Sequence, residues 1–258
     1  GTRDAAQDWG EECAGTMKNM GFEQGSASPC TFVHARRNLR SYIHGDDFVT
    51  TGLDKDLKWM KQELEKPYEL KTQVLGPDPE DSQQVRVLNR VLTWGVEGIS
   101  YEADLRHAEL VITDLQLTGA KGVVTPGTKE EGTTKADKDD KLGEEEASKY
   151  RGIVARLNYL AADRPDIAFS VKELARSMSS PDKGCQEKLK RLGRYLVTKP
   201  RAVMLFAWQS AQSKLNVYAD ADWAGCKESR KATTGGAIML GQHSIKTWGK
   251  TEALQAHR

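Results

Sequence analysis

The sequence is poor in the features that mark secreted, membrane-spanning and zinc-binding proteins. Its four cysteines lie far apart and form no C-x-x-C pair: Cys13, Cys30, Cys185 and Cys226. They indicate free thiols of a reducing compartment. No apolar run approaches the roughly 18 residues of a membrane helix, and no signal peptide is recognisable. We therefore expect neither secretion nor a membrane partner.

Several common catalytic patterns are also missing. The glycines match neither a P-loop nor a G-x-G-x-x-G fingerprint, and the five histidines show no H-E-x-x-H spacing. No Ser/His/Asp or Cys/His triad can be argued from the positions of these residues. The net charge is only +1, so bulk charge predicts no nucleic-acid partner. Any chemistry must come from carboxylates and from local basic clusters.

Two adjacent carboxylates stand out in Tyr42–Gly52, which reads Y-I-H-G-D-D-F-V-T-T-G. Strand-forming residues flank Asp46 and Asp47, and Gly45 precedes them, so the pattern predicts a tight hairpin with the pair at its tip. Two neighbouring carboxylates stay ionised most easily beside a cation, and Mg²⁺ prefers such hard oxygen ligands. The alternative is a solvated D-D turn.

Periodicity predicts mixed helices and strands in the first half of the chain. We expect helices over 4–20, 54–68 and 102–117, with Asp54 capping the second. We expect strands over 30–35, 41–48, 69–75, 85–96 and 99–101. Residues 118–143 are rich in Gly, Thr, Lys, Asp and Glu and indicate a flexible connector.

The second half predicts three helices and then strands. The helices cover 144–162, a segment starting at Pro165, and 184–198, and short strands follow over 203–208, 215–219, 236–240 and 244–248. The third helix has a basic outer face: Lys188, Lys190, Arg191, Arg194 and Lys199. This face is either solvated or a contact surface for phosphates. Asp220 and Asp222 end a strand, in the geometry of a metal ligand or of a simple turn.

Five blocks in a fixed order resemble the reverse transcriptase of copia-type LTR retrotransposons, running on into its ribonuclease H. They are G-T-R-D-A-A-Q-D-W, M-G-F-E-Q-G-S-A-S-P-C-T-F-V, H-G-D-D-F-V-T-T-G, K-Y-R-G-I-V-A-R-L-N-Y-L-A-A-D-R-P-D-I-A-F-S-V and Y-A-D-A-D-W-A-G with S-R-K-A-T-T-G-G. The third stands where the family has Y-V-D-D-I-L-I-T-G. The blocks together span nearly the whole chain.

The resemblance implies an α+β fold with four parts. Residues 1–117 would form the C-terminal part of the polymerase palm and the thumb, and 118–143 a flexible connector. Residues 144–200 would form a helical connection, and 201–258 the first strands of an incomplete ribonuclease H-like domain. The resemblance also implies a location in cytoplasmic virus-like particles or in the nucleus.

The same resemblance assigns roles to single residues. Asp46 and Asp47 would hold Mg²⁺, or Mn²⁺ in its place, for attack of a primer 3′-hydroxyl on a deoxynucleotide. Asp220 would be a catalytic metal ligand of the ribonuclease H, with Glu252 as a further ligand. Gly45 would lie near the primer end. The partners would be an RNA template and an RNA–DNA hybrid, with Lys188, Arg191 and Arg194 contacting nucleic acid.

Departures from the family pattern predict an incomplete enzyme. The third palm carboxylate of the family lies upstream of Gly1, together with the fingers, and the motif S-S-x-E-A-E-Y is only faintly matched around Glu252. We therefore expect a fragment truncated at both ends and inactive in isolation. Two alternatives stay open. One is a non-catalytic nucleic-acid-binding module derived from a retroelement. The other is an unrelated Mg²⁺-dependent phosphate enzyme that uses both Asp clusters.

Overall fold

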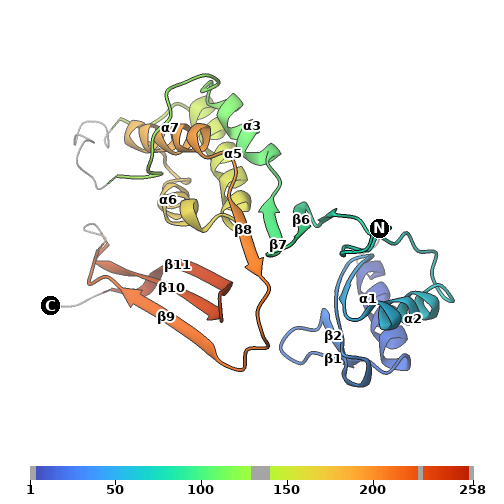
Figure 1. Cartoon of the computed structure of the whole chain (residues 1–258). Helices are drawn as coiled ribbons and strands as arrows, with labels where there is room; N and C mark the ends of the chain where they lie inside the picture. The colour runs from blue at the N-terminus through green and yellow to red at the C-terminus, as the bar shows by residue number, and fades with distance from the viewer. Residues whose placement is uncertain (1–3, 129–139, 226–228, 256–258) are drawn as a thin grey trace. The chain divides into compact units, whose positions relative to one another are not determined.

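The computed structural model describes residues 4–128, 140–225 and 229–255 (Figure 1). Within these ranges the chain has six α-helices, one short 3₁₀ helix and three antiparallel sheets. The α+β class expected from the sequence is confirmed. The chain divides into two compact units, Gly1–Gln73 and Val74–Arg258.

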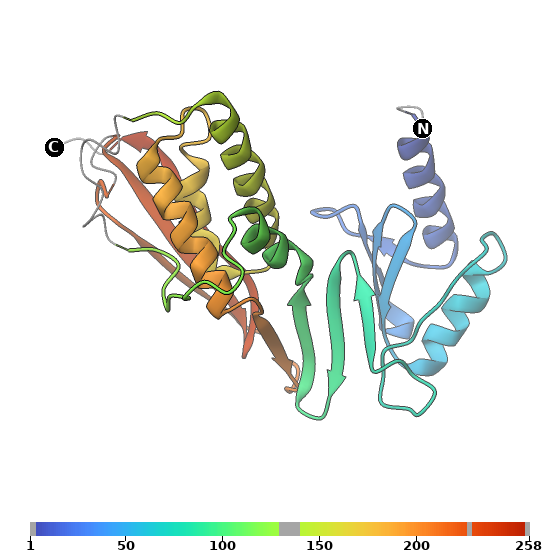
Figure 2. The same cartoon turned by 90° about the horizontal axis from the view of Figure 1, so that it is seen from above.

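The first unit packs two helices against a small antiparallel sheet (Figure 2). Its elements are α1 (Ala5–Asn19), β1 (Glu23–Gln24), β2 (Thr31–His34), η1 (Ala35–Arg37), β3 (Leu39–His44), β4 (Asp47–Thr51) and α2 (Asp54–Leu64). The sheet order is β1-β2-β3-β4. Burial alternates along β3, and Leu39 and Ile43 meet Met17 of α1 and Met60 of α2 in the core. The periodicity of two along a strand thus fixes which face meets the helices.

Three expectations for the first half are corrected. The helix expected over 54–68 ends at Leu64, and Leu53 is its N-cap, because Asp54 already belongs to the first turn. No strand forms over 69–75, where Leu75 makes only an isolated bridge to Ser82. The prolines that follow at 77 and 79 lack the N–H group that a ladder needs. The strand expected over 85–96 is a hairpin, because Leu88 and Asn89 have φ values of 47° and 63° and turn the chain.

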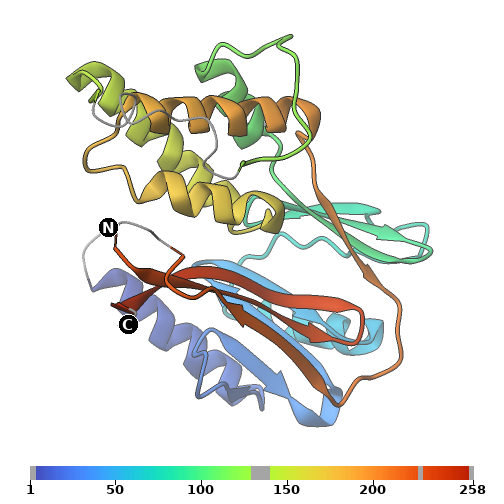
Figure 3. The same cartoon turned by 90° about the vertical axis from the view of Figure 1, so that its left-hand side faces the viewer.

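The second unit contains a four-helix cluster and two sheets (Figure 3). Its strands are β5 (Gln84–Val87), β6 (Arg90–Gly95), β7 (Gly98–Ala103), β8 (Val203–Ala207), β9 (Leu215–Ala221), β10 (Lys231–Leu240) and β11 (His243–Gln255). Its helices are α3 (Arg106–Asp114), α5 (Glu144–Ala161), α6 (Pro165–Ala175) and α7 (Lys183–Thr198). The expected helices over 144–162, from Pro165 and over 184–198 are confirmed.

The helices of this unit share one core. Val154, Leu157, Ile167, Leu192 and Leu196 are fully buried in it, as their helical spacing predicts. β8 follows α7 but pairs with β7, so the sheet order is β5-β6-β7-β8. The other sheet has the order β11-β10-β9, and the expected hairpin at Gly241–Gln242 is confirmed by the pairing of Leu240 with His243.

Candidate functional site

The carboxylate pair lies at the tip of the β3–β4 hairpin, as predicted. His44 and Asp47 form the last pair of the ladder, so Gly45 and Asp46 make a two-residue turn. Gly45 has a φ of 60°, whereas Asp46 is not among the residues with positive φ. This combination is typical of a type II′ turn, which needs glycine at its first central position. The local sequence therefore fixes where the two carboxylates stand.

Both carboxylates of the pair are open to solvent. Asp46 and Asp47 are exposed, and neither side chain has a hydrogen-bond or ion-pair partner in the part of the chain that the structure describes. Mg²⁺ is usually bound through one or two carboxylates, with waters and substrate phosphates completing its shell. The pair fits that ligand type. The described residues contain no group of three His, Cys, Asp or Glu side chains placed to hold a metal ion.

The turn is tied to the first helix by a tryptophan. The indole Nε1 of Trp9 donates a hydrogen bond to the carbonyl oxygen of Gly45 at 2.7 Å. The Trp9 ring packs edge-on against Tyr68 with ring centroids 5.5 Å apart, and the Tyr68 hydroxyl donates to Thr16 Oγ1 at 3.0 Å. Residues of α1 therefore hold the hairpin tip in place. The contact between Trp9 and Gly45 joins residues 36 positions apart, so no local sequence pattern reveals it.

The structure does not bring Asp220 and Glu252 together. Asp220 on β9 pairs with Gly235 on β10, whereas Glu252 on β11 accepts a hydrogen bond from the hydroxyl of Thr234. Successive residues of a strand point to opposite faces, so Asp220 and Glu252 lie on opposite faces of the sheet. Asp222 closes a turn, since its Oδ1 accepts from the backbone N–H of Gly225 at 3.2 Å, and the same oxygen accepts from the backbone N–H of Thr233 at 2.7 Å.

The basic face of α7 is partly covered. Lys188 is exposed, but Arg191 and Arg194 are half-buried. Arg191 donates to the hydroxyl of Thr125 at 2.8 Å, and Arg194 Nε donates to the carbonyl oxygen of Lys121 at 2.8 Å. The start of the segment 118–143, which we expected to be a flexible connector, therefore lies on α7, and residues 129–139 of that segment lie outside the described ranges.

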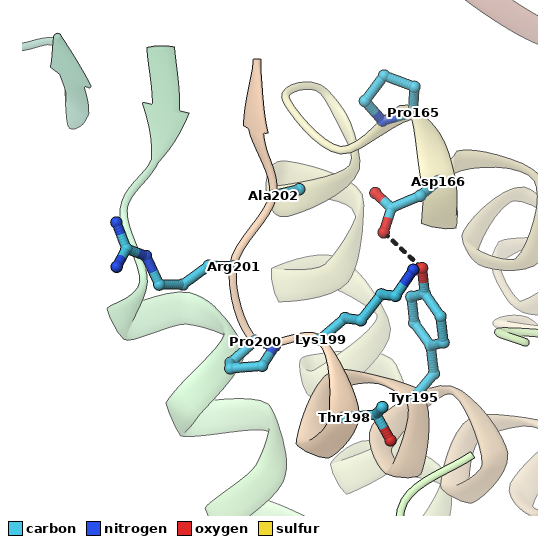
Figure 4. A pocket seen from close by; sticks show the side chains of 8 residues that line it. All are labelled: Pro165, Asp166, Tyr195, Thr198, Lys199, Pro200, Arg201 and Ala202. Carbon is cyan, nitrogen blue, oxygen red and sulfur yellow. Dashed lines mark hydrogen bonds between the residues drawn. The ribbon is translucent and has the colours of Figure 1, made fainter. Parts of the chain in front are cut away.

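A buried arginine organises the turn between α5 and α6. Arg164 is 1% exposed and donates to both carboxylate oxygens of Asp166, at 2.9 and 2.8 Å. Its remaining N–H groups donate to the carbonyl oxygens of Lys199 and Pro200 at 3.0 and 3.1 Å. The Tyr195 hydroxyl donates to Asp166 at 2.9 Å (Figure 4). The R-P-D part of the fourth block thus joins α6 to the end of α7.

The surroundings of Asp166 shift its acidity. Burial alone raises the pKa of the Asp166 carboxyl, but the hydrogen bonds and charge of Arg164, helped by Tyr195, outweigh burial and leave the pKa below its ordinary value. A surface hollow lies beside this carboxylate (Figure 4). Arg201 at its rim is held by Glu102 in a two-fold hydrogen bond at 2.7 Å. Asp166 is thus paired with Arg164, and Arg201 with Glu102. These pairings favour a structural role for Asp166 and Arg201.

The carboxylate of Asp163, next to Arg164, contacts the sheet of the second unit. Asp163 accepts from Arg90 Nε at 3.0 Å and from the Tyr101 hydroxyl at 2.5 Å, so it ties the helices to β6 and β7. Burial and the hydrogen bond to Asp163 raise the pKa of Tyr101 to about 12. Asp163 and Arg164 together fasten the sheet and the helical cluster of the second unit to the same turn.

None of the helices in the described ranges is long and apolar enough to cross a membrane.

The structure is that of an α+β protein with an exposed carboxylate pair on a two-residue turn. Comparisons with known proteins show which class of protein it resembles. The chain is similar to the retrovirus-related Pol polyprotein from transposon RE1 of Arabidopsis thaliana, with 39% identity over 105 residues, or 41% of this chain and 7% of that protein. It is also similar to the polyprotein from transposon TNT 1-94 of Nicotiana tabacum, with 27% identity over 247 residues, or 91% of this chain and 18% of that protein.

A third relative is an uncharacterised mitochondrial protein of Arabidopsis thaliana, AtMg00810, with 36% identity over 107 residues. The chain is thus a relative of copia-type retrotransposon Pol polyproteins, as the five sequence blocks predicted. The match spans less than a fifth of the polyproteins' own length. No family model and no solved structure matches the chain.

Proposed function

We propose that the chain is part of a retroelement RNA-directed DNA polymerase and ribonuclease H, and that residues 42–52 are the metal-binding hairpin of its palm. One observation carries the proposal. Asp46 and Asp47 are exposed and have no partner among the described residues, at a turn whose backbone Trp9 holds in place. Ordered carboxylates without a protein partner are suited to a hard cation and its phosphate ligands.

The metal bound there, Mg²⁺ or Mn²⁺, would neutralise the charge that develops on the transferred phosphoryl group. The hairpin would position the two carboxylates and leave the metal accessible to substrates. Asp46 and Asp47 are exposed at the turn. Gly45 leaves the surface beside them open, since a Cβ added there would meet no atom of the described residues within 4 Å. A primer end, an RNA template and a deoxynucleotide could approach from that side in the complete enzyme.

The isolated chain would not polymerise DNA. The hairpin supplies two carboxylates, and Asp220 and Glu252 lie on opposite faces of their sheet, so neither site is assembled by the described residues alone. We expect no primer extension on an RNA template with Mg²⁺ or Mn²⁺. Extension that disappears in Asp46→Asn would overturn the inactivity and support the polymerase hairpin. Extension that persists in Asp46→Asn would contradict the role of the pair.

The second candidate is a non-catalytic nucleic-acid-binding module, favoured by the basic residues of α7. Lys188 is exposed, and Arg191 and Arg194 follow it at three-residue intervals on the same side of the helix. Binding of a labelled RNA–DNA hybrid should weaken with salt by roughly one log unit per log unit of salt for each phosphate contact. Lys188→Gln should reduce that slope by about one. No binding at low salt would exclude this module.

A further inference from the structure

Residues 121–125, which we name the α7 strap, lie alongside the basic face of α7. The strap is held at three points. The backbone N–H of Val123 donates to the carbonyl oxygen of Arg194 at 3.3 Å, Arg194 Nε donates to the Lys121 carbonyl at 2.8 Å, and Arg191 donates to the Thr125 hydroxyl at 2.8 Å. Two of the three contacts use the arginine side chains that a phosphate would need.

The strap also fits the surface beneath it. Val123 packs against the helical core, whereas the next residue, Val124, is 80% exposed. Gly122 lies so near Thr198 of α7 that a Cβ there would collide with its hydroxyl. Side-chain packing at Val123 and backbone closeness at Gly122 therefore keep the strap on the helix.

Within the described part of the chain, Arg191 and Arg194 are bonded to the strap only through neutral acceptors, and one N–H donor of Arg191 is unused. Arg191 Nε is buried and has no hydrogen-bond partner among the described residues, and the partners of Arg191 and Arg194 on the strap are a neutral hydroxyl and a neutral carbonyl. A guanidinium offers five N–H donors in a fork that matches two oxygens of one phosphate. Charge-assisted bonds to phosphate are roughly twice as strong as bonds to neutral acceptors. The acceptors that the strap offers to the two arginines are therefore weaker than a phosphate, and a phosphate can replace them.

We propose that the α7 strap is a built-in competitor that masks Arg191 and Arg194 from nucleic-acid phosphates. When the strap is displaced, Lys188, Arg191 and Arg194 form one cationic row along α7 that contacts the phosphate backbone of an RNA–DNA hybrid. This inference rests on the proposed nucleic-acid binding and adds its regulation. It predicts that loosening the strap increases the affinity for the hybrid, and that the hybrid itself displaces the strap in the wild type.

The test compares variants of the full chain with a labelled RNA–DNA hybrid over a range of KCl concentrations. The strap-loosened variant is Val123→Ser with Thr125→Ala, which removes the apolar anchor and the hydroxyl partner of Arg191. Val124→Ser is the matched control, because that side chain faces solvent. The third variant adds Arg191→Gln and Arg194→Gln to the loosened strap. Amide exchange of Val123 in the wild type with and without hybrid is the second readout.

Loosening the strap should tighten binding of the hybrid at every salt concentration, because the hybrid no longer has to displace the strap. The slope of log affinity against log salt should stay as in the wild type, since both chains use the two arginines in the complex. Val124→Ser should bind as the wild type does, and the arginine substitutions should cancel the gain. Saturating hybrid should speed exchange of the Val123 amide. Equal affinities of the wild type and the loosened variant, with an unchanged Val123 amide, would overturn the strap proposal alone. Absence of binding by every variant would overturn the nucleic-acid-binding function itself.

Discussion

The indole nitrogen of Trp9 lies 2.7 Å from the carbonyl oxygen of Gly45, and this hydrogen bond joins α1 to the turn that presents Asp46 and Asp47. Trp9→Phe keeps an aromatic ring against Tyr68 but removes the donor. We expect a loss of about 0.5–1.5 kcal/mol at the hairpin, which corresponds to roughly two- to tenfold faster amide exchange. Hydrogen exchange of the hairpin amides at 44–48 measures it.

The control for this substitution is Trp223→Phe, because Trp223 is 77% exposed and lies in the other unit. It should leave exchange at the hairpin unchanged. If Trp9→Phe also leaves exchange there unchanged, the tryptophan does not hold the turn.

Asp166→Asn tests the buried arginine junction. Arg164 would lose the carboxylate that balances its charge while remaining 1% exposed. We expect the second unit to be destabilised by about 3 kcal/mol, since breaking a buried pair leaves an uncompensated charge. Glu187→Gln, at an exposed pair with Lys190, should cost at most about 1 kcal/mol. Equal effects of the two variants in urea unfolding would contradict the importance of the junction.

The same carboxylate predicts an acid response. Because the pKa of Asp166 is lower in the folded chain than in the unfolded chain, its stabilisation is present at neutral pH and is lost as pH falls through the folded-state pKa. The stability difference between wild type and Asp166→Asn should therefore shrink below about pH 4. A difference that stays constant from pH 7 into strong acid would mean that the ionised carboxylate is not what Arg164 needs.

Tyr101 predicts an alkaline response. Burial and Asp163 raise its pKa to about 12, so the folded chain retains a proton that the unfolded chain loses near pH 10. This contribution is present below pH 10 and is lost as pH rises toward 12. In an absorbance titration of the seven tyrosines, Tyr101→Phe should remove one of the late-titrating groups. Loss of an early-titrating group instead would place Tyr101 in solvent.

Gly98 lies where strand β8 comes too close to β7 for a larger residue. A Cβ at Gly98 would collide with the carbonyl oxygen of Phe206 on the neighbouring strand β8. Gly98→Ala should destabilise the β7–β8 pairing by about 1–3 kcal/mol. Gly249→Ala is the matched control, because no atom in the described part of the chain lies within 4 Å of a Cβ there. Thermal unfolding that does not distinguish the two variants would contradict this close approach.

Sequence periodicity predicted the local elements, such as helices and a hairpin, but it did not predict contacts between residues far apart in the chain. The helix over 144–162 was predicted because apolar residues repeat there with the helix period, and Val154, Leu157 and Leu160 of that repeat are buried. The Asp46–Asp47 hairpin was predicted because Gly45 and the flanking strand formers mark a turn. The pairing of β8 with β7 depends on residues about 100 positions apart and leaves no local signal. Arg164 was missed because a charged side chain is rarely buried unless it is paired.

The carboxylate pair itself also has a direct test. Mn²⁺ is paramagnetic and broadens the NMR signals of amides near its binding site, so a titration of the full chain reports where the ion is held. We predict that the amides of residues 45–48 broaden first, and that this broadening disappears in the double variant Asp46→Asn, Asp47→Asn. Broadening that is absent from the hairpin, or that persists in the double variant, would contradict the assignment of Asp46 and Asp47 as metal ligands.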